Sequence, residues 1–396
     1  MISLFTLKKA VLFWVKFVKS IINALIMKNF TFKLLLICMV LFSTSHFAQC
    51  TSVTLNSQLD VNNFGINNSE CTQISGNLQI NGADITDLSP LSNLTSVSGN
   101  VQLWGNSTLT SLQGLHNITN VGGILDLAGF NFPLVNLNGF SSLQTVGGMV
   151  SIQSFPSLVS VQGLSNLVSV GGNFLIQNNT NLDFTSISLS NLEFVGIFNV
   201  RNNNNLTTIQ FASLASVGTE FHLVGNPTLL TANFPALEVV GVNLVSEFQI
   251  NNGIFEISQC SSLLNPVFSS LTTIKGGLDI IQNNSLQSLG FQNLTTVLRN
   301  IRINSNPLLA SIDGLELTGT LTSFSLIGSN VVHLNALSEV TSIGFGNTGD
   351  LLIKDNPLLN DISGLSAITS INRNLEISNN DSLLNLNGLN ALSTIN

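Results

Sequence analysis

Four side chains that could bind a ligand or take part in catalysis recur at one position of a repeated strand motif. Glu256, Asp279 and Arg302 hold this position in consecutive copies, and His222 holds it earlier in the chain. Carboxylates beside a guanidinium can bind a polar ligand, and in some parallel solenoids carboxylates process polysaccharides as general acid and base. A row of charges is also an ordinary solvated surface.

The elements that carry these residues belong to a repeat of about 24 residues that runs from Cys71 to the end of the chain. Each copy has a Gly or Gly-Gly, a short Leu-x-Ile strand, an Asn shortly after it, and apolar residues at every third position. A Val or Ile before each glycine marks the copies at nearly equal intervals, at Ile74, Val97, Val121, Val146, Val170, Val195, Val217 and Val240. A fixed period of this size predicts a solenoid.

Within the strand motif, as at 101–103 and 375–377, the outer residues are apolar and the middle one is polar. This alternation is typical of a strand with one buried face. The sequence therefore predicts a mainly β fold, a right-handed parallel β-solenoid of about 13 coils. The glycines before the strands, such as Gly147 and Gly171, are predicted to take positive φ at a corner.

A second repeated position, shortly after each strand, carries mostly Asn. Amide side chains donate and accept hydrogen bonds, so stacked Asn residues can satisfy buried backbone groups of adjacent turns. We predict a structural ladder made of Asn106, Asn179, Asn203, Asn226, Cys260, Asn283, Asn306, Asn356 and Asn380. Cys260 is interpreted as a small buried member of this ladder. The alternative, a reactive thiol, would need a basic neighbour, and none is nearby in the sequence.

The repeat is interrupted twice. The interval between the markers Val240 and Ile274 is longer than the others, which predicts a protruding insertion near 241–254, either a binding loop or a tolerated one. Between 315 and 351 the pattern is blurred, and a strand is expected over 324–327. The chain stops just before the next strand is due, so we expect a truncated solenoid whose continuation holds an anchoring or sorting domain.

The amino-terminal segment differs from the rest in charge. Residues 1–48 contain six of the twelve basic residues and no acidic one, and an apolar run covers 34–42. This layout predicts a secretory signal region over 1–48, with Met27 as the true start and cleavage near Ala48. The apolar run is too short to span a bilayer. Residues 49–73 are assigned to an amino-terminal cap and 74–396 to the solenoid.

Removal of the signal region leaves 12 − 6 = 6 basic and 20 acidic residues, a net charge of about −14. This charge disfavours nucleic acid and anionic membranes as partners. Export also permits disulfides, and Cys50 with Cys71 is the expected pair, which would close the cap. Two free thiols are the alternative.

Other chemistry-bearing residues are scattered. His116, His222 and His333 fall on separate coils without the spacing of a metal or nucleophile site, and no phosphate loop, CxxC pair or calcium loop occurs. We therefore predict no metal and no cofactor. Trp104 directly follows a strand and is a candidate for stacking on a carbohydrate or contacting a partner, with packing against the terminal coils as the alternative.

Two motifs carry a family resemblance. Gly-Asn-Leu-Gln-Ile at 76–80 and Gly-Asn-Val-Gln-Leu at 99–103, joined by Leu-Ser-Pro-Leu-Ser-Asn-Leu-Thr-Ser-Val at 88–97, resemble the receptor L-domain family. That family supplies ligand-binding lobes of insulin- and epidermal-growth-factor-type receptors and has relatives among bacterial surface proteins. The resemblance extends over 71–396 and implies a leucine-rich-repeat-like solenoid. Because the receptors' cysteine-rich modules and kinase are lacking, signalling is not implied.

Two further resemblances concern shorter segments. Ile-Thr-Asp-Leu-Ser-Pro-Leu at 85–91 is also similar to internalin-type leucine-rich-repeat adhesins, the nearest rival description. Phe-Ala-Gln at 47–49 is similar to the signal ends of exported proteins of Bacteroidetes-type bacteria.

The sequence thus predicts a recognition or adhesion protein rather than an enzyme, secreted or displayed on the outer surface of a bacterial cell. An extracellular protein or carbohydrate would bind the sheet face at His222, Glu256, Asp279, Arg302 and Trp104. Membrane attachment is expected only through the missing carboxy-terminal anchor. A polysaccharide-processing β-helix enzyme and a passive structural solenoid are the alternatives.

Overall fold

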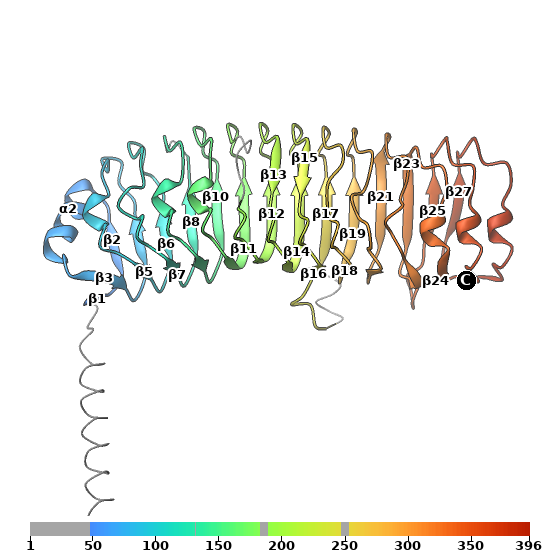
Figure 1. Ribbon diagram of the computed structural model, residues 1–396, viewed down its shortest axis with the longest axis horizontal. Helices are drawn as coiled ribbons and strands as arrows, with labels where there is room; N and C mark the ends of the chain where they lie inside the picture. Colours follow the sequence, from blue (N-terminus) through green and yellow to red (C-terminus); the bar gives the residue numbers. More distant parts are fainter. Residues whose placement is uncertain (1–47, 131, 183–188, 247–252) are drawn as a thin grey trace, which may run out of the picture. The chain divides into compact units, whose positions relative to one another are not determined.

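Fourteen parallel strands, one from each coil, lie side by side along the solenoid and carry the candidate site (Figure 1). The computed structural model describes residues 48–130, 132–182, 189–246 and 253–396. Cys50–Asn396 forms one compact unit. The predicted parallel β-solenoid with its regular repeat is confirmed, with 14 such strands where about 13 coils were expected.

The 14 strands belong to a 22-stranded sheet. They are β2 (Val53–Leu55), β4 (Leu78–Ile80), β6 (Val101–Leu103), β8 (Leu125–Ala128), β10 (Val150–Gln153), β11 (Ser169–Gln177), β12 (Phe194–Arg201), β14 (Ser216–Val224), β17 (Ile254–Ser258), β19 (Gly277–Ile281), β21 (Ile301–Asn306), β23 (Phe324–Ser329), β25 (Leu351–Lys354) and β27 (Leu375–Ser378). The strand expected over 324–327 is β23.

Shorter strands complete this sheet and form two smaller ones. The sheet also contains β1 (Ala48–Cys50), β3 (Cys71–Ile74), β5 (Ser96–Val97), β7 (Asn120–Val121), β9 (Thr145–Val146), β16 (Val239–Val240), β18 (Thr273–Ile274) and β20 (Thr296–Val297). The smaller sheets pair β13 (Thr208–Gln210) with β15 (Thr231–Asn233), and β22 (Thr318–Leu321), β24 (Glu339–Ile343), β26 (Ser370–Ile371) and β28 (Thr394–Ile395).

Helical segments are short. The 3-10 turns are η1 (Ser89–Leu91), η2 (Asn138–Phe140), η3 (Gln162–Leu164), η4 (Asn335–Leu337), η5 (Ser363–Leu365) and η6 (Asn387–Leu389). Near the amino-terminal end, α2 (Gln58–Asn67) is capped by Ser57, whose hydroxyl accepts a hydrogen bond from the backbone N–H of Asp60. The helix buries Val61 and Phe64. No helix in the described parts of the chain is long and apolar enough to cross a membrane.

The described residues omit two predicted features in whole or in part. The predicted signal region lies outside them except for Ala48, where β1 begins. The predicted insertion, 241–254, falls partly on residues 247–252, which also lie outside them.

Phenylalanine rings fill the interior of the central coils. One column contains Phe174, Phe198, Phe221 and Phe255, and a second contains Phe211, Phe234, Phe268 and Phe291. In the first column the ring centroids of Phe221 lie 4.7 Å and 4.6 Å from those of Phe198 and Phe255. Rings of different columns meet edge to face, as for Phe221 and Phe234 at 5.1 Å. Both geometries suit the aromatic quadrupole and add to the gain from apolar burial.

The Asn side chains are buried and bonded from coil to coil. Asn203 donates from Nδ2 to the carbonyl oxygen of Ile176 at 3.1 Å, and its Oδ1 accepts the backbone N–H of Asn179 at 3.1 Å. Its own N–H donates to Oδ1 of Asn226 at 3.0 Å. The donation to a carbonyl of an earlier coil recurs in Asn106, Asn179, Asn226, Asn283, Asn306, Asn356 and Asn380. The amides thus satisfy backbone groups that the stacking removes from water.

The glycine interpretation was wrong. Gly147 and Gly171, and the glycines that follow them, Gly148 and Gly172, are not among the residues with positive φ. Glycine is needed at these positions because neighbouring coils approach closely there. A Cβ on Gly147 would lie 2.2 Å from the carbonyl oxygen of Gly122, and a Cβ on Gly171 would lie 2.1 Å from the carbonyl oxygen of Gly147. Left-handed backbone occurs instead after the strands, directly before the ladder position, as at Asn202 with φ of 55°.

Replacing Asn203 by Ala should lower the free energy of unfolding by about 2–4 kcal/mol, because two buried backbone groups lose their partners. Denaturant titration measures the loss. Asn205→Ala is the control, since Asn205 is exposed just after the ladder position. Equal stability of the two variants would contradict the ladder's role.

Replacing Phe221 by Ala should cost about 3–5 kcal/mol, since the cavity would open between rings of both columns. Phe221→Leu retains much of the volume and should cost clearly less. Thermal and denaturant unfolding of the two variants tests this order, and a similar loss in both would argue against a tightly packed column.

Candidate binding face on the parallel sheet

The middle residues of the 14 strands form a continuous outward row, because each is paired in register with the next. Its members, in order, are Thr54, Gln79, Gln102, Asp126, Ser151, Leu175, Asn199, His222, Glu256, Asp279, Arg302, Ser325, Leu352 and Glu376. The longer interval after Val240 does not disturb the row, so His222 is paired directly with Glu256 of the next coil.

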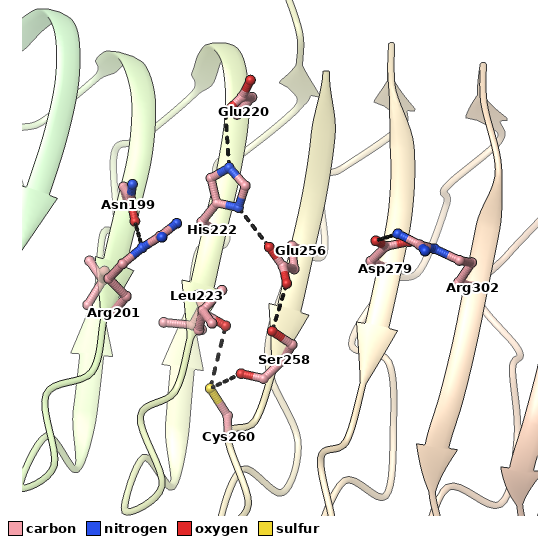
Figure 2. A network of polar contacts seen from close by, with 12 residues as sticks. Asn199, Arg201, Glu220, His222, Leu223, Glu256, Ser258, Cys260, Asp279 and Arg302 are labelled. Carbon is pink, nitrogen blue, oxygen red and sulfur yellow. Dashed lines mark hydrogen bonds and ion pairs between the residues drawn. The ribbon is translucent and has the colours of Figure 1, made fainter. Parts of the chain in front are cut away.

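His222 links two carboxylates across this face (Figure 2). Its Nδ1 lies 2.9 Å from Oε2 of Glu256, and its Nε2 lies 3.0 Å from Oε2 of Glu220. The hydroxyl of Ser258 donates to the other oxygen of Glu256 at 2.8 Å. Because both ring nitrogens face carboxylate oxygens, both can donate only when the imidazole is protonated.

The pKa values of these groups reflect this arrangement. Burial opposes the charged form of His222, but the hydrogen bonds to Glu220 and Glu256 outweigh burial and raise the pKa of His222 above its ordinary value. The hydrogen bond with His222 in turn lowers the pKa of Glu256, against the effect of burial and with help from Ser258. The raised pKa of His222 favours a carboxylate–imidazolium–carboxylate cluster.

Asp279 and Arg302 form a two-point ion pair on the next two coils. Nε of Arg302 donates to Oδ1 of Asp279 at 2.7 Å, and Nη2 donates to Oδ2. The side chain of Asp279 is 5% exposed and that of Arg302 is 52% exposed. The sequence predicts an outward row of charges, with a solvated surface as one alternative, but Asp279 is buried. It holds the guanidinium in place, and Arg302 is the member that a ligand can contact.

Three neighbours of this cluster were not predicted. Glu220, Ser258 and Arg201 each lie two positions from a row member on the same strand, and therefore on the same face. Nε of Arg201 donates to Oδ1 of Asn199 at 2.6 Å. The alternation of the strand motif is the sequence signal that could have identified them. We refer to Arg201, Glu220, His222, Glu256, Asp279 and Arg302 as the charged patch.

Trp104 is not part of the charged patch. It follows β6, five strands of the row away from β14, which corresponds to about 24 Å at the usual strand spacing. Its side chain is 37% exposed.

The three cysteines in the described part of the chain have structural roles. Cys50 and Cys71, on either side of α2 in the sequence, form a disulfide. Cys260 is buried in the ladder, with Sγ 3.5 Å from the carbonyl oxygens of Leu223 and Ser258, and burial raises its pKa to about 12. A thiol in this state is a poor nucleophile.

Neither His116 nor His333 joins the patch. Nδ1 of His116 lies 3.2 Å from the amide nitrogen of Gln113, and Nε2 of His333 lies 3.9 Å from a carboxylate oxygen of Asp313. Among the described residues no group of three or more His, Cys, Asp or Glu side chains could hold a metal ion.

With the fold and the face described, comparison with known families is informative. Residues 70–132 match the family model of the receptor L domain. This segment runs from β3 to β8 and includes both motifs that carried the resemblance. The receptor L-domain match indicates a ligand-binding recognition role, without specifying the ligand. No curated protein matches the chain.

We predict that His222 titrates above about 6.5, the usual histidine value. Because its pKa is raised in the folded state, its contribution to stability is complete below that value and is lost as the pH rises through the folded pKa. Nitrogen-detected NMR of the imidazole follows the titration directly.

Glu220→Gln and Glu256→Gln should each lower the pKa of His222, since each removes one negative partner. Glu238→Gln, at an acid that is not among the groups shifting the pKa of His222, serves as the control. An unchanged pKa in both cluster variants would contradict the arrangement.

Proposed function

We propose that this protein is a secreted or surface-displayed recognition protein that binds an extracellular protein or carbohydrate on its outward sheet face, with the charged patch at the centre of the contact. The observation that carries the proposal is the register of the row. Side chains from four successive coils form two hydrogen-bonded pairs, His222 with Glu256 and Arg302 with Asp279, which are in place before any ligand arrives. Such preorganisation lowers the entropy cost of binding.

The charge of the patch supports a ligand of mixed polarity. Three carboxylates oppose two guanidiniums and one imidazolium, so the formal sum is zero while His222 is protonated. A balanced patch with fixed donors and acceptors favours protein surfaces and carbohydrate hydroxyls over a polyanion such as nucleic acid.

The internal contacts of the patch favour recognition over polysaccharide cleavage. A general acid or base needs a carboxyl group that exchanges protons with the substrate. Glu220 and Glu256 both bond His222, Asp279 bonds Arg302, and the pKa of Glu256 is lowered. These contacts occupy oxygens of the three carboxylates, and the lowered pKa of Glu256 makes it a poorer proton donor. The varied composition of the row also speaks against a passive repetitive lattice.

Export is part of the proposal. The signal layout of 1–48 and the disulfide between Cys50 and Cys71 support it, because disulfides persist in oxidising compartments. Attachment to a cell would then depend on an anchor beyond the sheet face.

A screen of the full chain on protein and glycan arrays tests the proposal, followed by affinity measurements on any ligand found. Asp279→Ala combined with Arg302→Ala should weaken binding about tenfold or more, because it removes the exposed guanidinium that a ligand would contact. Replacing both residues together leaves no buried charge unpaired, so the fold should be retained. Lys354→Ala with Glu376→Ala is the matched control, since these residues form a 2.8 Å ion pair on the same face further along.

Equal affinity of the two double variants would show that the charged patch is not the contact centre. Turnover of a polysaccharide by the wild-type chain would favour the enzyme alternative instead.

A further inference from the structure

We propose that the outward face carries a second subsite, around Trp104, that takes a neutral sugar ring. This inference rests on the proposed function, since it assumes that the sheet face is the binding face. It concerns different coils from the charged patch and a different chemistry, so it can fail independently.

The first observation is the space beside the indole. Leu103 is fully buried, so the alternation of the strand turns Trp104 outward. Directly beyond the Leu103–Leu127 pair, the neighbouring coil carries Ala128, which offers only a methyl group at the position beside Trp104. Trp104 is 37% exposed.

The second observation is a directed chain of amide contacts that ends beside Trp104. The hydroxyl of Thr54 donates to Oε1 of Gln79 at 3.2 Å, and Nε2 of Gln79 donates to Oε1 of Gln102 at 3.0 Å. The chain thus occupies the acceptor of Gln102. Its Nε2 and the carboxylate of Asp126, the next member of the row, have no hydrogen-bond partner among the described residues.

The third observation is a further aromatic side chain on the adjacent coil. Phe130 follows β8 and is 72% exposed. Of the large exposed aromatic side chains in the described parts of the chain, Trp104 and Phe130 lie on neighbouring coils, and Phe345 lies near the other end. Exposed aromatic side chains on neighbouring coils, one of them beside free polar groups, are typical of a binding surface rather than a merely solvated one.

These groups match the chemistry of a pyranose. The weakly positive C–H groups of a sugar face pack on the electron-rich face of an indole, while a free amide N–H and a free carboxylate can bond adjacent hydroxyls. None of these residues carries a positive charge, and Asp126 is an acid, so a uronate or sulfated sugar would be repelled. The occupant is therefore a neutral residue of a glycan.

Tryptophan fluorescence tests the subsite directly. The chain has two Trp and no Tyr, so Trp14→Phe in the full chain leaves Trp104 as the only strong emitter. Neutral oligosaccharides of glucose, mannose and galactose are titrated, with an oligogalacturonate for comparison. A saturable change in emission is expected with a neutral oligosaccharide and not with the oligogalacturonate.

Two variants should weaken that binding about tenfold or more. Trp104→Ala removes the indole on which the sugar would pack, and its binding is measured by calorimetry because the variant no longer has a strong emitter. Ala128→Leu retains the indole but places a larger side chain beside it. Trp104→Phe should retain most of the affinity, and Phe345→Ala, at an exposed aromatic elsewhere, should retain all of it. Circular dichroism confirms that each variant is folded.

The proposal is overturned if no neutral oligosaccharide changes the emission, or if Trp104→Ala and Ala128→Leu bind as tightly as their parent. It is also overturned if the chain self-associates and Trp104→Ala abolishes this, because the face would then bind a second copy. If only the Asp279→Ala, Arg302→Ala variant loses binding, the proposed subsite at Trp104 is wrong, but the proposal that the sheet face binds the ligand stands. If only the Trp104 and Ala128 variants lose binding, the subsite is supported and the charged patch is not the centre of the contact.

Discussion

The stacking of coils depends on satisfying the backbone at the corner that follows each strand. There the chain turns through a left-handed residue, as at Asn202, and buries N–H and C=O groups that strand pairing does not reach. The ladder amides bond these groups from coil to coil. Asn203, for example, bonds two backbone groups of the preceding coil through its side chain and the amide of the next ladder residue through its own N–H. Since an unpaired buried backbone group costs as much as a lost hydrogen bond, this contact makes the repeat length nearly constant.

A constant repeat in turn produces the binding face. Residues one repeat apart occupy the same position along neighbouring strands, so each coil contributes one side chain to the outward row. His222 and Glu256 meet because the longer interval between their coils leaves the register intact. The interior supports this rigidity, since rings such as Phe221 and Phe255 stack on the buried side of the strands that carry the charged patch.

The two parts of the face differ in chemistry although they share one geometry. Around His222 the polar groups bond one another and leave a balanced charge, which suits a ligand with both donors and acceptors. Around Trp104 the polar groups offer free donors and acceptors, Asp126 is the acid, and aromatic surface is exposed. A long ligand such as a glycan chain could contact both, whereas a compact protein epitope would use only one.

The sequence by itself determined the fold, because period and alternation are local properties: the spacing of Leu375 and Ile377 already predicts a strand with one buried face. It also placed His222, Glu256, Asp279 and Arg302 in one row. Only the tertiary structure decided that His222 bonds Glu220 as well, that Asp279 is buried, and that the glycines before the strands avoid contact between coils rather than turn a corner. Those outcomes depend on distances between coils, which no pattern along the chain contains.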